Sequence, residues 1–304
     1  MPQLLKAGVP AGILLVDKPG GITSHDVVSK SRRALGTRKI GHAGTLDPMA
    51  TGLLVLGVEG ATRLLTFIVG LDKTYEATIR LGAATDSDDA DGEITARADA
   101  GSVDSVSEEA IAVGIAALTG EISQVPSTVS AIKVAGRRAY DLARAGETVE
   151  LAARNVTISR FEIVGVRRTA EAIDLDVVVD CSTGTYIRAL ARDLGASLGV
   201  GGHLTALRRT HVGPFAVVDA ADIDSLGAND LLPPAPVAAS ILGAFPVSDD
   251  EARDLRHGKK LIGAAERLTT KLAAAITPAG VLVGIVECRG ADVKSAMNMP
   301  EAQE

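Results

Sequence analysis

One short segment alternates so strictly between apolar and polar residues that a single kind of regular structure accounts for it. In residues 74–81, Tyr75, Ala77, Ile79 and Leu81 fall on one side, and the positions between them are polar or charged. Successive side chains of a β-strand point to opposite faces of a sheet, so this period of two predicts a strand with one buried face. The fold must therefore contain a sheet that packs against a core.

The other patterned segments mix strands and helices without a regular alternation. Ser24 is predicted to cap a helix that ends at Gly36, and a turn at residues 182–184 leads into a second helix. Because the order does not follow the strand–helix–strand repeat of a doubly wound sheet, the sequence predicts an α+β fold. Further predicted elements are strands at 13–16, 53–58 and 174–181 and a helix at 107–118.

The C-terminal part of the chain is predicted to form a separate domain. We expect a boundary near residue 244, which gives one domain over residues 1–243 and another over residues 244–304. In the second domain, residues 249–257 are predicted to be a short helix and residues 281–286 a strand. Near the boundary the pattern breaks at a group of prolines: Pro233, Pro234, Pro236 and Pro246.

Composition and spacing exclude several classes of protein. No run approaches the roughly 20 apolar residues of a membrane span, and the first residues lack the pattern of a secretory signal. Two cysteines, Cys181 and Cys288, are too few for a disulfide framework, and the five histidines show no metal-binding spacing. We therefore expect a reduced, cytoplasmic protein without a metal site.

The net charge of −7 conceals a segregation of basic and acidic segments. Residues 1–84 and 125–215 are net basic, whereas residues 85–124 and 216–304 are net acidic. The densest acidic stretch, residues 85–93, is predicted to be a solvated loop. Local patches act independently when the Debye length is about 8 Å, so the total charge does not exclude a polyanionic partner. The basic clusters are Lys30, Arg32, Arg33, Arg38 and Lys39, and then Lys133, Arg137, Arg138 and Arg144.

The segment at residues 41–52 is the richest in residues typical of a functional loop. It reads GHAGTLDPMATG and combines three glycines and a proline with His42 and the lone carboxylate of Asp47. An aspartate can be a nucleophile, a general base or a metal ligand, but an Asp-Pro pair is also common in plain turns. The chain shows no phosphate-binding loop, dinucleotide fingerprint or serine elbow. By elimination, a carboxylate without metal or cofactor is left.

Several other candidate residues are ambiguous when each is taken alone. Arg188 begins a predicted helix and Arg192 follows one turn later, which is also the pattern of a solvated helix face. Arg208 and Arg209 are most simply a basic strand end, and Tyr75 is most simply a core aromatic. Only the combination of these residues along the chain points to a function.

Five motifs occur in a fixed order: LVDKP at 15–19, GHAGTLDPMATGLL at 41–54, KTY at 73–75, GTYIR at 184–188 and LRRT at 207–210. Together they resemble the TruB family, the bacterial tRNA pseudouridine-55 synthases, over about residues 12–215. Between them, residues 124–133 look like the entry to the RNA-gripping thumb of that family. Ser127 stands there where many members have a second proline.

The resemblance implies an isomerase that converts uridine-55 in the T-loop of tRNA to pseudouridine without cofactor or metal. It implies that Asp47 is the catalytic aspartate, that Arg188 pairs with it and that Tyr75 stacks against the target uracil. A neighbouring cation favours an ionised carboxylate, and a flipped base must be held by stacking and hydrogen bonds. Whether Asp47 attacks C1′ of the sugar or C6 of the uracil, or assists removal of a sugar proton, is left open.

The same resemblance implies a set of RNA-binding residues. His42 would fill the gap that the flipped base leaves in the T-loop, Lys18 and Pro19 would buttress the pocket, and Leu207 would line it. Basic side chains would meet phosphates, which positions RNA without reading its sequence. These basic residues are Arg208 and the two basic clusters: Lys30, Arg32, Arg33, Arg38 and Lys39, and Lys133, Arg137, Arg138 and Arg144.

The implied architecture is a pseudouridine synthase fold. It has a central mixed, largely antiparallel sheet flanked by helices, with a thumb-like insertion at about residues 125–155. Residues 244–304 resemble a small PUA-type β domain that binds RNA. We expect a monomer with tRNA as its partner. Two alternatives stay open: a synthase for another RNA uridine, and a tRNA-binding or folding chaperone with secondary catalysis.

Overall fold

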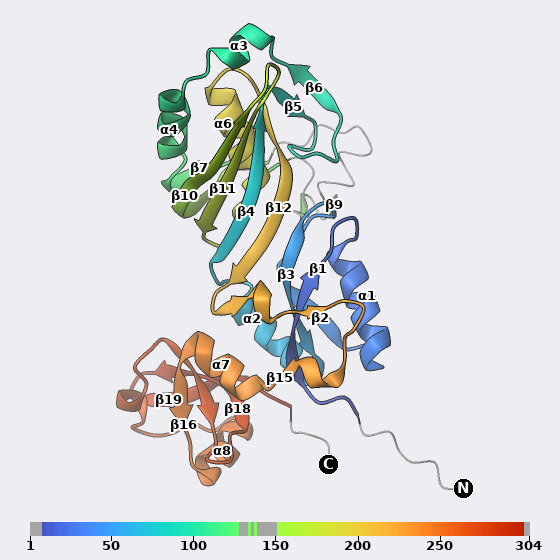
Figure 1. Cartoon of the computed structure of the whole chain (residues 1–304). Helices are drawn as coiled ribbons and strands as arrows, with labels where there is room; N and C mark the ends of the chain where they lie inside the picture. The colour runs from blue at the N-terminus through green and yellow to red at the C-terminus, as the bar shows by residue number, and fades with distance from the viewer. Residues whose placement is uncertain (1–7, 128–132, 135–136, 139–150, 301–304) are drawn as a thin grey trace, which may run out of the picture. The chain divides into compact units, whose positions relative to one another are not determined.

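The computed structural model describes residues 8–127, 133–134, 137–138 and 151–300 (Figure 1). None of the helices in these ranges has the length and apolar character that a membrane crossing needs. The chain separates into two compact units. Unit 1 is formed by Met1–Asp47, Gly52–Val69 and Val212–Glu304, and unit 2 by Pro48–Thr51 and Gly70–His211.

The first sheet of unit 1 is built on two long antiparallel strands. β1 (Gly12–Lys18) pairs along its whole length with β3 (Thr51–Val58). β2 (Ile40–Ala43) pairs antiparallel with β3. β14 (Ala221–Asp222) runs parallel to β1, and β15 (Leu231–Leu232) runs antiparallel to it. The sheet is therefore mixed and largely antiparallel, as predicted.

Helix α1 (Ser24–Leu35) packs its apolar side on this sheet, where Val27 and Leu35 join a buried cluster. Its N-cap is Thr23 and not Ser24, so the predicted cap was wrong by one residue. The Thr23 hydroxyl accepts a bond from the Asp26 backbone N–H, and the Asp26 carboxylate accepts one from the Thr23 backbone N–H. This reciprocal capping box satisfies two N–H groups at once, which a cap at Ser24 would not do.

Unit 2 contains a sheet with the strand order β12-β4-β11-β10-β7. Its strands β10, β11, β4 and β12 lie side by side in Figure 1. The predicted alternation in residues 74–81 is confirmed, because Tyr75, Ala77, Ile79 and Leu81 are all buried. The strand bounds are β4 Lys73–Leu81, β7 Gly120–Gln124, β10 Arg154–Arg168, β11 Ile173–Cys181 and β12 Gly202–Val212.

Two helices of unit 2 pack closely against each other. They are α4 (Glu108–Ala117) and α6 (Ile187–Ser197), and a Cβ added at Gly114 would lie 2.7 Å from Cδ1 of Leu194. The helix predicted at residues 107–118 is confirmed within one residue at each end, and the helix predicted to follow the turn at residues 182–184 is confirmed as α6. The smaller elements of the unit are β5 Ala83–Thr85, β6 Ile94–Arg97, α3 Ala100–Asp104, β8 Lys133–Val134 and β9 Arg137–Arg138.

A separate four-stranded sheet follows in the C-terminal part, with the order β16-β17-β18-β19. The predicted helix and strand are confirmed as α8 (Asp249–Arg256) and β18 (Leu282–Arg289). Their core includes Phe245, Leu255 and Val283. The boundary between domains at residue 244 stays a prediction. The other strands are β16 Ala244–Pro246, β17 Leu272–Ile276 and β19 Asp292–Asn298.

Three local predictions need correction. The proline group starts a helix, α7 (Pro234–Leu242), because proline is well suited to a first turn, where its missing N–H has no partner to lose. The start of the predicted loop at residues 41–52 belongs to β2. Arg208 and Arg209 lie inside β12 and not at its end. The remaining short elements are η1 Glu59–Leu64, α2 Leu65–Ile68, β13 Phe215–Ala216, η2 Val217–Asp219, η3 Ala228–Asp230 and η4 Ala265–Arg267.

Candidate active site

Asp47 lies in the loop that joins the adjacent strands β2 and β3. His42 is opposite Leu56 in this pair, so the chain leaves β2 after Ala43 and returns into β3 at Thr51. The Asp47 side chain is half-buried. A carboxylate on a loop between two fixed strands is held in place while it stays accessible to a ligand, as a catalytic group requires.

Ser24 holds the residue that precedes Asp47. Its Oγ accepts a bond from the backbone N–H of Leu46 at 2.8 Å and donates one to the backbone C=O of Leu46 at 3.0 Å. Ser24 and Leu46 are both buried, so water does not compete for these groups. Because Thr23 caps the helix, the Ser24 hydroxyl is available to fix the loop to α1. Sequence analysis assigned Ser24 to the cap and missed this role.

Lys18 and Pro19 lie at the end of β1, on the same edge of the sheet as the Asp47 loop. The register places Lys18 opposite Gly52, just after that loop. Lys18 is completely buried, and its Nζ donates to the carbonyl of Pro19 at 2.9 Å. Unit 1 therefore brings Asp47, Lys18 and Pro19 to one end of its sheet. His42 lies on β2, the strand that leads into the Asp47 loop.

The other predicted site residues belong to unit 2. Tyr75 on β4 is 8% exposed, and Leu207 on the neighbouring strand β12 is 7% exposed. Arg208 is half-buried and its Nη1 lies 3.4 Å from Oγ1 of Thr51. A tyrosine held this firmly by the sheet keeps a fixed ring position, which stacking against a planar ligand requires.

Arg188, in the first turn of α6, is buried and does not form part of a solvated helix face. Its Nη1 donates to the carbonyl of Ser87 at 2.8 Å and lies 3.4 Å from Oδ2 of Asp89. The Arg188 and Asp89 side chains are 3% and 6% exposed. The prediction of a solvated acidic loop at residues 85–93 was therefore wrong for its centre. The density of acidic residues predicted exposure to solvent. However, arginines of α6, about 100 residues later in the chain, pair with two of these carboxylates.

Asp88 makes the second connection between this loop and α6. Its Oδ2 lies 3.3 Å from Nη1 of Arg192, and Arg192 Nη2 donates to the carbonyl of Val125 at 2.7 Å. Burial raises the pKa of Asp88, against the opposing effect of Ser127 and Arg192. Asp88 also has a φ of 62°, a left-handed conformation that aspartate tolerates better than most residues. The loop is thus shaped to present two adjacent carboxylates to two arginines.

Gln124 fixes the start of the helix that bears Arg188. Its Oε1 accepts from the backbone N–H of Tyr186 at 2.8 Å, and its Nε2 donates to the Tyr186 carbonyl at 3.1 Å. Tyr186 is the N-cap residue of α6 and offers no side-chain cap of its own. The buried Gln124 amide therefore ties the end of β7 to the beginning of α6. The only local indication of this contact is a polar residue at the end of a strand.

Two buried cations of unit 2 were also missed. Lys73 on β4 is 6% exposed and Arg209 on β12 is 1% exposed. Burial, with a smaller effect from Arg209, lowers the pKa of Lys73 to about 8. Burial raises the pKa of the Cys181 thiol to about 11. Lys73 lies in the KTY motif and Arg209 in the LRRT motif, but neither side chain was predicted to be buried.

The predicted thumb lies mostly outside the described residues. Lys133 and Arg138 pair in a short antiparallel ribbon formed by β8 and β9, as do Val134 and Arg137. The residues around this ribbon fall outside the described ranges, and so do the side-chain positions of Lys133, Arg137 and Arg138. Among the residues that are described, no three His, Cys, Asp or Glu side chains gather as a metal site would require.

Comparison with solved structures identifies the fold. A chain in the structure of an H/ACA RNP bound to a substrate RNA containing 2′-deoxyuridine has a TM-score of 0.68 and 23% identity. The match covers 95% of this chain and 85% of that one. A chain in a Cbf5-Nop10-Gar1 complex has a TM-score of 0.67 and 23% identity, over 96% and 84% of the two chains. This chain therefore shares the fold of those two solved chains, which confirms the predicted fold class.

Sequence comparison then gives the family. The model of the TruB family pseudouridylate synthase N-terminal domain matches residues 32–187, and that of the tRNA pseudouridylate synthase B C-terminal domain matches residues 188–231. A tRNA pseudouridine synthase B of Leifsonia xyli subsp. xyli is 56% identical over 96% of this chain and 97% of that protein. One of Nocardia farcinica is 55% identical over 92% and 90%. The chain belongs to the TruB family and is an isomerase that converts uridine in RNA to pseudouridine.

Proposed function

We propose that this protein isomerises uridine-55 in the T-loop of tRNA and that Asp47 is its catalytic carboxylate. The observation that supports this most directly is the position of Asp47. It is a half-buried carboxylate on a strand-to-strand loop, held through Leu46 by the buried hydroxyl of Ser24. A protein that only bound or refolded RNA would have no need to fix a carboxylate in this way.

The reaction breaks a C–N glycosidic bond and re-forms the link as C–C, so the uracil must detach, turn and reattach without escaping. In our proposal the ionised Asp47 acts on the nucleotide, and the positive charge of Arg188 favours the ionised form. Tyr75 stacks against the flipped uracil, a contact worth about 1–3 kcal/mol. Asp89 and Ser87 orient Arg188 from within unit 2.

RNA binding uses other parts of the chain in the same proposal. His42 occupies the gap that the flipped base leaves, Lys18 and Pro19 support the pocket wall, and Leu207 lines it. The thumb at about residues 125–155 grips the T-arm through its basic residues, which are Lys133, Arg137 and Arg138, and Arg208 adds a contact from β12. Residues 244–304 form a PUA-like domain, and the protein works as a cytoplasmic monomer.

Tritium release from C5-labelled uridine in a T-arm stem-loop tests the proposal. The protein is expected to release one tritium per stem-loop when the label is at position 55. It is expected to release none when position 55 is cytidine and the label is at the other loop uridines. Release from those other uridines would instead support a different target, and binding without any release would support a chaperone. In the same assay Tyr75→Phe should retain most of the rate, and Tyr75→Leu should lose more.

Ser24→Ala is expected to lower kcat by about 10–100-fold with little change in KM. The substitution leaves the buried N–H and C=O of Leu46 unsatisfied, at about 1–3 kcal/mol for such a group. A displacement of about 1 Å at a reacting group can reduce the rate by about 10²-fold. Ser31→Ala is the matched control, because Ser31 is a buried serine on α1 whose hydroxyl donates to the carbonyl of Val27 in its own helix. Equal effects of the two substitutions on kcat would contradict the role of Ser24.

A further inference from the structure

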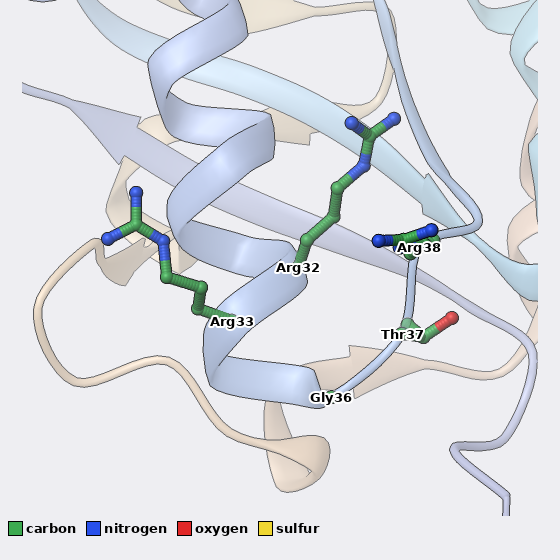
Figure 2. Close-up of a pocket in the computed structure, with 5 residues that line it drawn as sticks. All are labelled: Arg32, Arg33, Gly36, Thr37 and Arg38. Atoms are coloured by element: carbon green, nitrogen blue, oxygen red, sulfur yellow. The ribbon is translucent and has the colours of Figure 1, made fainter.

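Arg192 is an arginine of α6 to which the mechanism proposed above gives no role. It lies one turn after Arg188, and residues four apart on a helix share one face. Arginines at a helix surface commonly extend into solvent. Around the hollow at the end of α1, Arg32 and Arg33 point to different sides of the helix, and Arg33 is exposed (Figure 2). The Arg192 side chain, by contrast, is only 29% exposed. A cation that is withdrawn from water in this way needs bonded partners in the protein.

Each nitrogen of the Arg192 guanidinium group has such a partner. Nε donates to Oδ1 of Asp193 at 2.8 Å, and Nη2 donates to the carbonyl of Val125 at 2.7 Å. Nη1 lies 3.3 Å from Oδ2 of Asp88. A planar fork with N–H donors on three nitrogens can make these contacts at once, which the single ammonium group of a lysine cannot match. Arg192 therefore joins α6 both to the segment at residues 85–93 and to the residue that follows β7.

Asp88 separates the two groups that Arg188 contacts. The carbonyl of Ser87 accepts a bond from Nη1 of Arg188 at 2.8 Å, and Oδ2 of Asp89 lies 3.4 Å from the same nitrogen. The backbone angles of Asp88 set how the Ser87 carbonyl and the Asp89 side chain lie relative to each other. A change in these angles would therefore move at least one of the two partners away from Arg188.

The backbone conformation of Asp88 depends on support from other segments. Its φ is 62°, in the left-handed region that glycine enters freely and that other residues keep only where their surroundings fix them. The carbonyl of Asp88 accepts a bond from the backbone N–H of Leu204 at 3.0 Å. The carboxylate is held by Arg192, and this side chain of Asp88 is only 12% exposed. Without Arg192, Asp88 loses its ion pair with α6 and its conformation is held less firmly.

We propose that Arg192 is a positioning residue for the isomerisation. It holds Asp88 in its left-handed conformation and thereby keeps the two partners of Arg188 in place. Arg192 does not touch the substrate and acts through the first arginine of the helix face. This inference rests on the proposed function, since it takes Arg188 as the cation that favours the ionised form of Asp47. Two arginines one turn apart on α6 thus hold three consecutive residues of one loop.

Arg192→Met tests this role through the effects on kcat and KM. Methionine keeps much of the packing volume and removes every N–H donor. Tritium release at saturating RNA should slow by about 10–100-fold, because a displacement of about 1 Å at a reacting group can reduce the rate by about 10²-fold. KM should stay within about threefold of its original value. An unchanged rate would overturn the positioning role and leave the proposed function standing, since the unaltered protein would still release tritium from position 55.

Arg80→Met is the matched control for a general loss of stability. Arg80 also pairs with an aspartate within unit 2, and its Nε and Nη2 each lie 2.7 Å from a carboxylate oxygen of Asp174. Its substitution removes an ion pair of good geometry but leaves the contacts of α6 intact. Urea unfolding gives the conditions under which both variants are folded, and the rates are compared there. An equal loss of rate in the two variants would show an effect of stability alone and would contradict the proposal.

Substitutions at Asp88 show whether Arg192 acts through this residue. Asp88→Asn should keep at least about a third of the rate, because the amide oxygen still accepts a bond from Arg192 and asparagine tolerates the left-handed conformation. Asp88→Ala should slow the reaction about as much as Arg192→Met does. The two substitutions together should slow it by less than about twofold more than either alone, since both break the same contact. Losses that multiply in the double variant would show that Arg192 acts through another contact and would overturn the proposal.

Discussion

Asp47→Asn is expected to reduce pseudouridine formation by at least about 10³-fold, while the affinity for tRNA changes by less than about tenfold. The amide has nearly the shape of the carboxylate but cannot serve as a nucleophile or a base. Because Ser24 holds the loop through the backbone of Leu46, the substitution removes the chemistry without moving the chain. Single-turnover tritium release measures the rate, and fluorescence anisotropy measures binding.

The matched control is Asp219→Asn, which neutralises an exposed aspartate of the same unit. It should leave both rate and affinity unchanged. If Asp47→Asn kept more than a tenth of the turnover, Asp47 would not be the catalytic group. The expected loss is the same whether Asp47 attacks the sugar C1′, attacks the uracil C6 or removes a sugar proton. All three steps need the ionised carboxylate, so the result tests the residue and not one chemical route.

The parts of the structure that sequence predicted well are those with local causes. Residues 74–81 form a half-buried strand because their own alternation sets which side chains enter the core. Gly36 ends α1 because a glycine readily takes the left-handed conformation that is needed there. The loop with Asp47 was found because its motif is continuous along the chain. In each case the residues that decide the structure are neighbours in sequence.

The parts that sequence missed depend on contacts between distant segments. Ser24 and Leu46 are 22 residues apart, and Ser87 and Arg188 are 101 residues apart. A single sequence gives no sign that a serine beside a helix cap will hold the loop that carries Asp47. Residues 85–93 also have the composition of a solvated loop, but two arginines of α6, Arg188 and Arg192, pair with carboxylates at its centre. Charge patterns predict solvent exposure only where no later element neutralises them.

Arg188→Met is expected to lower the free energy of unfolding of unit 2 by about 3–5 kcal/mol. Methionine retains much of the volume but removes the cation, so Asp89 would be left as a charge with little contact with water. The Asp89 side chain is only 6% exposed, which makes this loss much larger than that of a surface ion pair. Asp89→Asn should destabilise the unit to a similar extent, because it removes the charge that compensates buried Arg188. Urea unfolding at neutral pH measures both effects.

Two comparisons show whether the buried ion pair itself is responsible. The double variant with Arg188→Met and Asp89→Asn should be more stable than the sum of the single effects predicts, by about 1–3 kcal/mol. Arg192→Met is the comparison, because the Arg192 and Asp88 side chains are 29% and 12% exposed, so water weakens this pairing more than that of Arg188 with Asp89. Its loss should be clearly smaller than that of Arg188→Met. Additive single effects, or an equal loss at Arg192, would show that the segment at residues 85–93 is held by its backbone contacts. In that case Asp89 would not be what fixes the position of Arg188.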